Sequence, residues 1–138
     1  MDDFKIALFE REHSNRFPPY ETLTYEGCGR IRTSLASKYG VNSFRLEVEL
    51  AAMQSVCSEV NGEELKLLHI LTSLGVNPMP NVYINWCQFE RIDKIAIAAL
   101  DKFFDDIWFP VSDDIDLFDE SLSWVLSIRH DGVVSFMK

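Results

Sequence analysis

Near its C-terminal end the chain reads Leu122-Ser-Trp-Val-Leu-Ser-Ile-Arg-His-Asp-Gly-Val-Val-Ser-Phe-Met137. Within residues 122–129, large apolar side chains occupy every second position, and Ser, Val, Ser and Arg occupy the others. A period of two predicts a strand with one buried face and one face at least partly exposed to water. Asp131-Gly132 is a signal for a two-residue hairpin turn, so residues 133–137 are predicted to return antiparallel to this strand.

Shorter extended segments are predicted ahead of this hairpin. Residues 81–87, Asn-Val-Tyr-Ile-Asn-Trp-Cys, are rich in β-branched and aromatic side chains, which favour strands. Two short apolar runs, 107–109 and 115–118, are also predicted to be extended. The sequence therefore predicts that most of the sheet is built from the C-terminal half.

Helical spacing dominates the first part of the chain, where apolar residues recur every three or four positions. Helices are predicted at 22–39, 43–60, 63–74 and 92–104. Gly40 is placed to end the first, Asn61-Gly62 breaks the second, and Glu63 and Glu64 begin the third with acidic residues in its first turn. Residues 1–17 fit either a short helix or a strand. Together these segments predict one α+β domain spanning residues 1–138, with N-terminal helices followed by a small, mainly antiparallel β-sheet and a C-terminal hairpin.

The chain is acidic, with 13 Lys and Arg against 22 Asp and Glu and a net charge of −9. That balance argues against direct nucleic-acid binding, which needs a basic face. An apolar content of 47% excludes a disordered acidic tail, and no apolar run approaches the length of a membrane span. Met1-Asp2-Asp3 is acidic where a signal peptide would be basic, so a soluble cytoplasmic chain without membrane contact is expected.

The three cysteines indicate neither a metal site nor a disulfide framework. Cys28, Cys57 and Cys87 are odd in number, far apart in sequence, and lack the spacing of zinc ligands. They are expected to be reduced thiols that pack as small buried hydrophobic groups. No cofactor is expected from the sequence.

Residues 101–120 carry most of the net negative charge. They contain eight acidic residues and one basic residue, Lys102, for a net charge of −7. The same segment contains five aromatic residues. Three interpretations remain open: a solvated acidic face whose aromatic side chains belong to the core, a divalent metal site, or an interface in which carboxylates flank an aromatic anchor. An EF-hand is excluded, because a loop starting at Asp114 would place Phe118 and Val125 at ligand positions 5 and 12.

Motifs for catalysis are missing from the sequence. There is no GxSxG, HExxH or Walker A pattern. His130-Asp131 has the residue types of a base and its orienting acid, but adjacent residues at a hairpin turn usually point apart. The chain is therefore expected not to be an enzyme and to contain no catalytic residues.

Several short segments of the C-terminal part resemble a known class of proteins. They are Asn81-Val-Tyr-Ile-Asn-Trp86, Asp105-Asp-Ile-Trp-Phe-Pro110, Ser112-Asp-Asp-Ile-Asp-Leu-Phe-Asp119, Trp124 and His130-Asp-Gly132. In these segments the chain resembles small acidic bacterial immunity proteins that accompany polymorphic toxins, including those of contact-dependent growth inhibition systems.

The resemblance implies a non-enzymatic inhibitor that binds and neutralises a cognate toxin domain, a basic nuclease, in the cytoplasm. The residues expected to meet the partner are Asp105, Asp106, Asp113, Asp114, Asp116 and Asp119, with Trp108 as an aromatic anchor or, alternatively, as a core residue. Reversing Asp113, Asp114 and Asp116 to Lys is expected to leave the fold intact. The rival interpretation is a small metal-dependent or ligand-sensing domain that uses the Asp cluster at 105–119.

Overall fold

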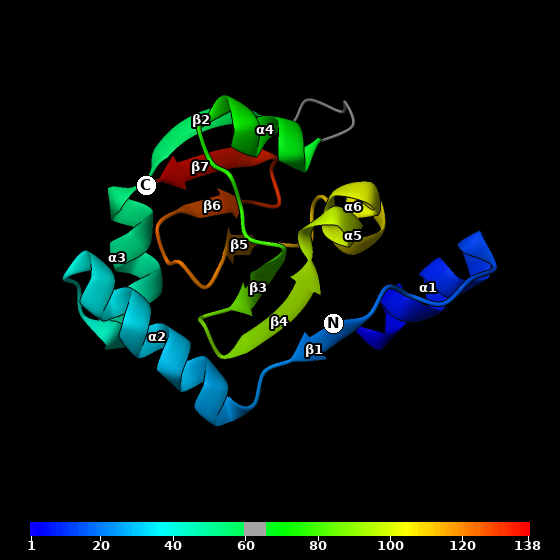
Figure 1. Ribbon diagram of the computed structural model, residues 1–138, viewed down its shortest axis with the longest axis horizontal. Coiled ribbons are helices and arrows are strands. Elements are labelled where there is room, and N and C mark those ends of the chain that lie inside the picture. Colours follow the sequence, from blue (N-terminus) through cyan, green and yellow to red (C-terminus); the bar gives the residue numbers. More distant parts are fainter. Residues whose placement is uncertain (60–65) are drawn as a thin grey trace.

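The computed structural model describes residues 1–59 and 66–138 and has an α+β architecture (Figure 1). The strands within these residues form one sheet in the order β1-β4-β3-β5-β6-β7-β2, and every recorded pairing is antiparallel. The strands are β1 (Tyr20–Thr22), β2 (Ser55–Glu59), β3 (Asn81–Cys87), β4 (Arg91–Ala96), β5 (Ile115–Phe118), β6 (Val125–Ile128) and β7 (Val133–Met137). The predicted fold class is confirmed, although β1 and β2 come from the part of the chain expected to be helical.

Helices cover both faces of this sheet. They are α1 (Asp3–His13), α2 (Tyr25–Tyr39), the 3-10 turn η1 (Ser43–Arg45), α3 (Leu46–Met53), α4 (Leu67–Ser73), α5 (Ile97–Lys102) and α6 (Phe104–Ile107). Apolar residues of α1, α4, α5 and α6 pack on one face, and those of α2 and α3 pack on the other. None of the helices in the described residues is long and apolar enough to cross a membrane.

Because helices cover both faces of the sheet, the residues of the central strands are buried on both sides. All four residues of β5 and all four of β6 are buried. Leu126 and Ile128 face the core under α1, α4, α5 and α6, whereas Val125 faces α2 and α3. The predicted partly exposed face at 122–129 is therefore exposed only toward its ends, at Ser123 and Arg129, because a second helix layer covers Val125 and Ser127 between them. The strand also begins later than predicted, at Val125, since Leu122 has a positive φ of 54°.

The predicted C-terminal hairpin is confirmed, with Leu126 paired to Phe136 and Ile128 to Val134, but its loop spans the three residues 130–132 and not the two predicted. At its turn, the backbone N–H of Arg129 donates to the carbonyl of Val133 at 3.0 Å. Gly132 has a φ of 87°, a left-handed conformation that glycine adopts at little cost.

Two of the helix predictions are confirmed over most of their length. The segment 22–39 forms α2, which ends where Gly40 adopts a φ of 67° and donates to the carbonyl oxygens of Ala36 and Ser37. The segment 63–74 contains α4. The predicted break at Asn61-Gly62 and the helix start at Glu63 and Glu64 lie outside the described residues. Residues 1–17, left open between helix and strand, contain α1.

Two helix predictions are wrong in part, because sheet pairing outweighs helical spacing. The segment 43–60 is helical only to Met53, and β2 then pairs with β7. In the segment 92–104, residues up to Ala96 belong to β4, which pairs with both β1 and β3. The run 107–109, predicted to be extended, lies outside the strands, since α6 includes Ile107.

The cysteines are free thiols, as expected, but only one is in the core. Cys28 is buried, whereas Cys57 and Cys87 are exposed. The prediction of burial is therefore wrong for these two, because Cys57 belongs to the edge strand β2 and Cys87 is the last residue of β3.

The central strand should be sensitive to loss of side-chain volume. Leu126→Ala removes a fully buried side chain and is expected to lower the free energy of unfolding by about 2–5 kcal/mol. Val48→Ala, at an exposed position of α3, serves as the control and is expected to change it by less than about 0.5 kcal/mol. Urea unfolding measures both; equal costs would contradict this description of the core.

Candidate protein-binding surface

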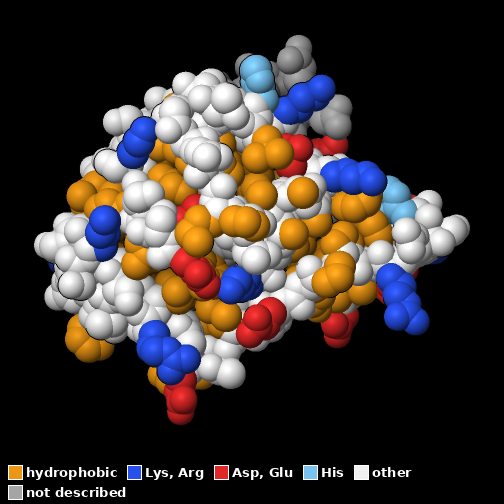
Figure 2. Space-filling view, viewed as in Figure 1, with side chains coloured by type: hydrophobic (Ala, Val, Ile, Leu, Met, Phe, Trp, Pro, Cys, Tyr) orange, Lys and Arg blue, Asp and Glu red, His pale blue; other side chains and the backbone are white. Residues whose placement is uncertain are grey.

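The predicted acidic segment does not form one acidic surface. Each of its ends is anchored by hydrogen bonds and ion pairs, and its carboxylates are divided between the interior and the surface. In Figure 2, Asp and Glu side chains are scattered over the visible face and interspersed with Lys and Arg. The predicted partner-binding residues are therefore described one at a time below, each with the contacts of its side chain.

Asp113 is tied to the N-terminal helix. The ammonium of Lys5, which is only 3% exposed, forms an ion pair with Asp113 and donates to the carbonyl of Ile107 at 2.7 Å. The other contact of the carboxylate is with the backbone N–H of Phe109, at 2.8 Å. Asp113 thus joins α1 to the loop after α6, a structural role that leaves little of its carboxylate to a partner.

Trp108 is a core residue. Its indole Nε1 donates to the carbonyl of Asp113 at 3.0 Å, and its ring stacks on Phe104 with 5.8 Å between centroids. Because the side chain is buried among the residues under α6, the alternative that placed Trp108 on the surface as an anchor is wrong. Its polar atom finds a partner, as buried tryptophans usually do.

Asp116 is the centre of a buried polar network on the α2–α3 face of the sheet. Its carboxylate accepts from Asn85 Nδ2 at 2.9 Å, from the Ser127 hydroxyl and from the guanidinium of Arg129 at 3.1 Å. Ser127 in turn accepts a hydrogen bond from the side chain of Gln54 at 2.7 Å. Asp116→Lys would place a cation beside Arg129 in the interior, so the expectation that its reversal leaves the fold intact is wrong.

Asp119 is also buried, at 1% exposure. Its carboxylate accepts from the backbone N–H of Met79 at 3.0 Å, from Trp124 Nε1 at 3.0 Å and from the backbone N–H and hydroxyl of Ser121. Burial acts to raise the pKa of Asp119, but these donors outweigh it and hold the pKa below its usual range. The expectation that Asp116 and Asp119 lie on a contact surface is therefore wrong.

Three of the predicted acidic residues remain accessible. Asp105 and Asp114 are exposed, and Asp106 is half-buried. Asp114 Oδ1 accepts from the backbone N–H of His130 at 2.7 Å and contacts the His130 ring at 2.9 Å. Partial burial of Asp114 acts to raise its pKa, but the hydrogen bonds from His130 lower it. Partner binding by these three residues stays a prediction.

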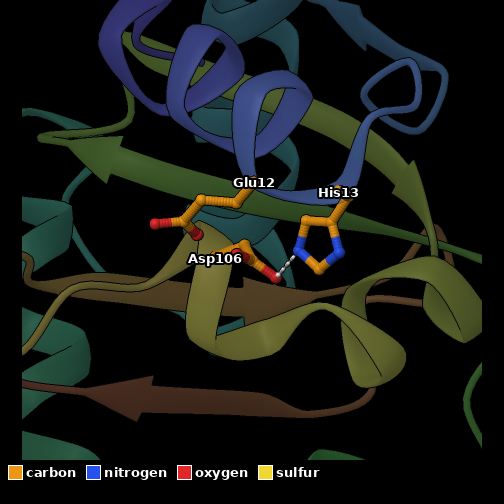
Figure 3. A group of neighbouring side chains, drawn as sticks. All are labelled: Glu12, His13 and Asp106. Atoms are coloured by element: carbon orange, nitrogen blue, oxygen red, sulfur yellow. Dashed lines mark hydrogen bonds and ion pairs between the residues drawn. The ribbon is translucent and has the colours of Figure 1, made fainter.

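Asp106 belongs to a small group of possible metal ligands that the sequence did not indicate. Glu12 and His13 end α1, and Asp106 reaches toward them from α6 (Figure 3). One ligand atom from each lies within 4.8 Å of the others, and His13 Nε2 contacts Asp106 Oδ2 at 3.1 Å. The chemistry suits a cation, although the hydrogen bond between His13 and Asp106 also explains the arrangement without one.

A different surface, also missed by the sequence analysis, exposes apolar side chains on η1, α3 and β2. Phe44 is 92% exposed and Val48 is one helical turn beyond it. Both line a cavity of about 340 Å³ between α3, α2 and the β3–β4 turn, together with Arg32, Arg45 and Glu47 among others. The sequence analysis missed this surface because it predicted one continuous helix over 43–60, which gives no reason to expect exposed apolar residues here.

Carboxylates lie next to this apolar surface. Burial raises the pKa of Glu47 above its usual range, and the nearby charges of Asp116 and Asp114 raise it further, while Arg129 opposes them. Glu47 and Asp114 are thus close enough to repel one another. The combination of carboxylates and an exposed aromatic residue, expected around Trp108, occurs instead around Phe44.

Asp119→Asn tests the structural role of the acidic segment. Loss of the charged acceptor is expected to lower the free energy of unfolding by about 2–3 kcal/mol at pH 7. Because the pKa of Asp119 is lower in the folded chain than its ordinary 3.8, its stabilisation is present above pH 3.8 and is lost as the pH falls through the folded pKa. The cost of the substitution, measured by urea unfolding, should shrink toward pH 3; a cost independent of pH would contradict this. Asp3→Asn, at an exposed position, is the control.

Comparisons with known proteins identify no relative of this chain. A scan against protein-family models finds no match. Searches of curated proteins and of solved structures find no match either. Function is therefore inferred from the residues and contacts described above.

Proposed function

We propose that this chain is a non-enzymatic immunity protein that binds and neutralises a cognate toxin domain, a basic nuclease, in the bacterial cytoplasm. The observation that carries the proposal is the pairing of negative charge with an exposed aromatic group. Glu47 lines the same cavity as Phe44 and is also subject to the negative charge of Asp114, on a chain whose net charge is −9.

The electrostatics of this surface favour a cationic partner. Glu47 is half-buried, and its negative neighbours and its burial both disfavour its ionised form. A lysine or arginine brought against Glu47 and Asp114 would relieve that repulsion. Nuclease clefts are basic because they hold phosphates, so a toxin of this class has the complementary charge.

The resemblance to immunity proteins supports the same conclusion from the sequence. Of the carboxylates it assigns to partner binding, Asp105, Asp106 and Asp114 are accessible. These side chains would contribute mainly to the rate of encounter, since exposed charges steer association more than they add affinity. Apolar contacts would supply most of the affinity.

Neutralisation is the direct test of this proposal. The tagged chain is used to retain proteins from its producing cells, and each retained basic protein is expressed alone and together with the chain. Growth arrest by the partner alone and normal growth on co-expression is the expected result. If no retained protein is toxic alone, the immunity function is wrong.

The electrostatic part is tested by reversing two charges. Glu47→Lys with Asp114→Lys is expected to slow association with the toxin domain at least about tenfold at low salt and to flatten its dependence on ionic strength. Glu26→Lys, at an exposed position in the first turn of α2, is the matched control. Stopped-flow binding measures the rates, and equal rates for both variants would exclude this surface as the source of steering.

A metal-dependent domain is the second candidate, and the group of Glu12, His13 and Asp106 is the observation that favours it. One imidazole and two carboxylates are ligands that Zn²⁺ accepts. If this function holds, low-millimolar Zn²⁺, Ca²⁺ or Mg²⁺ should raise the Tm of the chain, and Asp106→Asn should abolish the rise. An unchanged Tm would exclude the candidate.

A further inference from the structure

We propose that the exposed apolar residues of η1, α3 and β2 form the docking surface for a cationic protein partner. This apolar surface consists of Phe44, Val48, Ala51, Ala52, Met53 and Val56, all exposed. The inference rests on the proposed function for the identity of the partner, but its location follows from the contacts below. In this inference the aromatic anchor is Phe44, which is exposed, and not Trp108, which is buried.

The sequence of α3 is unsuited to a helix with a solvated outer side. Leu46 and Leu50 are buried under α2 and against the sheet, so the side bearing Val48 faces outward. A helix at the surface normally carries polar residues there. Here Val48, Ala51 and Ala52 share the outer side, because residues three and four apart lie on one helix face. Figure 2 shows hydrophobic side chains exposed at the left of the molecule, where Figure 1 places α3.

The surface continues from α3 onto the sheet. Val56 is 66% exposed and pairs with Ser135 of β7, so both side chains lie on the same face of the sheet. That face is the one covered by α3, since Met137, two residues after Ser135, packs in the core beneath α2 and α3. Among the residues that the structure describes, β2 is the last strand of the sheet, and its outer edge offers backbone groups to a partner strand.

A cavity gives the surface a place for a partner side chain. Phe44 and Val48 line the cavity of about 340 Å³, whose wall also contains Glu47 and Glu90 and the guanidinium groups of Arg32 and Arg45. Arg32 forms an ion pair with Glu90 at 3.9 Å, so Glu47 is the carboxylate of the wall to which a partner cation is assigned. Fully desolvated anchors in such pockets carry most of the energy of protein interfaces, and arginine is common among them. An arginine of the partner would place its stem against Phe44 and its guanidinium near Glu47.

Charge selects a cationic partner over a second copy of the chain. The α3 segment, Leu-Glu-Val-Glu-Leu-Ala-Ala-Met, contains Glu47 and Glu49 and no basic residue. Asp114 adds a further negative charge beside Glu47. Two copies of the chain, each with a net charge of −9, would repel one another, whereas a basic domain would be attracted.

Tyr25 provides a matched control, because it is an aromatic residue that is 83% exposed. It is the first residue of α2, whereas η1 lies just beyond the last residue of that helix. The 15 residues of α2 place the two ends of that helix about 20 Å apart, and Tyr25 is not among the residues that line the cavity of Phe44. Substitutions at Tyr25 therefore change a similar amount of exposed aromatic surface away from the proposed site.

Site-specific cross-linking in the producing cells tests the docking surface. Phe44→p-benzoylphenylalanine and, separately, Tyr25→p-benzoylphenylalanine are introduced into the full chain and irradiated. The expected result is one adduct between position 44 and a basic protein, with none at position 25. Val48→Arg should reduce that adduct at least tenfold without lowering the Tm, while Tyr25→Arg should leave it unchanged.

The outcomes separate this inference from the proposed function. A second copy of the chain in the adduct, equal yields at positions 44 and 25, or no adduct at position 44 would each overturn the docking surface. If a toxin is neutralised but does not cross-link at position 44, the immunity function stands and the surface is wrong. If position 44 cross-links to a basic protein that is not toxic alone, the surface stands and the immunity function is wrong.

Discussion

Two buried carboxylates, Asp116 within β5 and Asp119 directly after it, limit how the neighbouring strands and loops can pack. Asp116 and Asp119 are inside a sheet covered on both faces, where an ionised group is tolerated only with hydrogen-bond donors around it. The donors are Asn85, Arg129 and Ser127 for Asp116, and Met79, Ser121 and Trp124 for Asp119. Asn85 and Met79 are the most distant of them in sequence, whereas Ser121 and Trp124 follow Asp119 closely. These bonds fix β3, β6 and the loop before β3 relative to β5.

The same constraint explains why the acidic segment is not an acidic surface. Eight carboxylates in 20 residues would repel one another if they were all solvated together. The fold distributes them among Lys5, Arg129, His13, His130 and backbone N–H groups. A smaller set of carboxylates reaches the surface, namely Asp105, Asp106 and Asp114, and the charge of Asp114 acts on Glu47 of α3.

In this arrangement the exposed charges and the exposed apolar side chains would contribute differently to partner binding. Under the proposed function, exposed carboxylates would act over a Debye length of about 8 Å at physiological salt and attract a basic partner. Phe44, Val48 and the outer edge of β2, the last strand among the described residues, would then offer the area and the backbone groups that hold it. The proposed neutralisation of a toxin would draw on both, because it requires fast association and slow dissociation.

Local periodicity and turn chemistry were enough to predict the α+β class, the helix ending at Gly40, the strands at 81–87 and 115–118 and the C-terminal hairpin. That 55–59 and 91–96 join the sheet could not be read from their own residues, since their pairing partners are supplied by other strands. Only the tertiary structure decided that Trp108, Asp116 and Asp119 are interior and that Phe44 is exposed. Residue type and spacing specify which chemistry a side chain can perform, but whether it faces water depends on the second layer of helices, which no local pattern reveals.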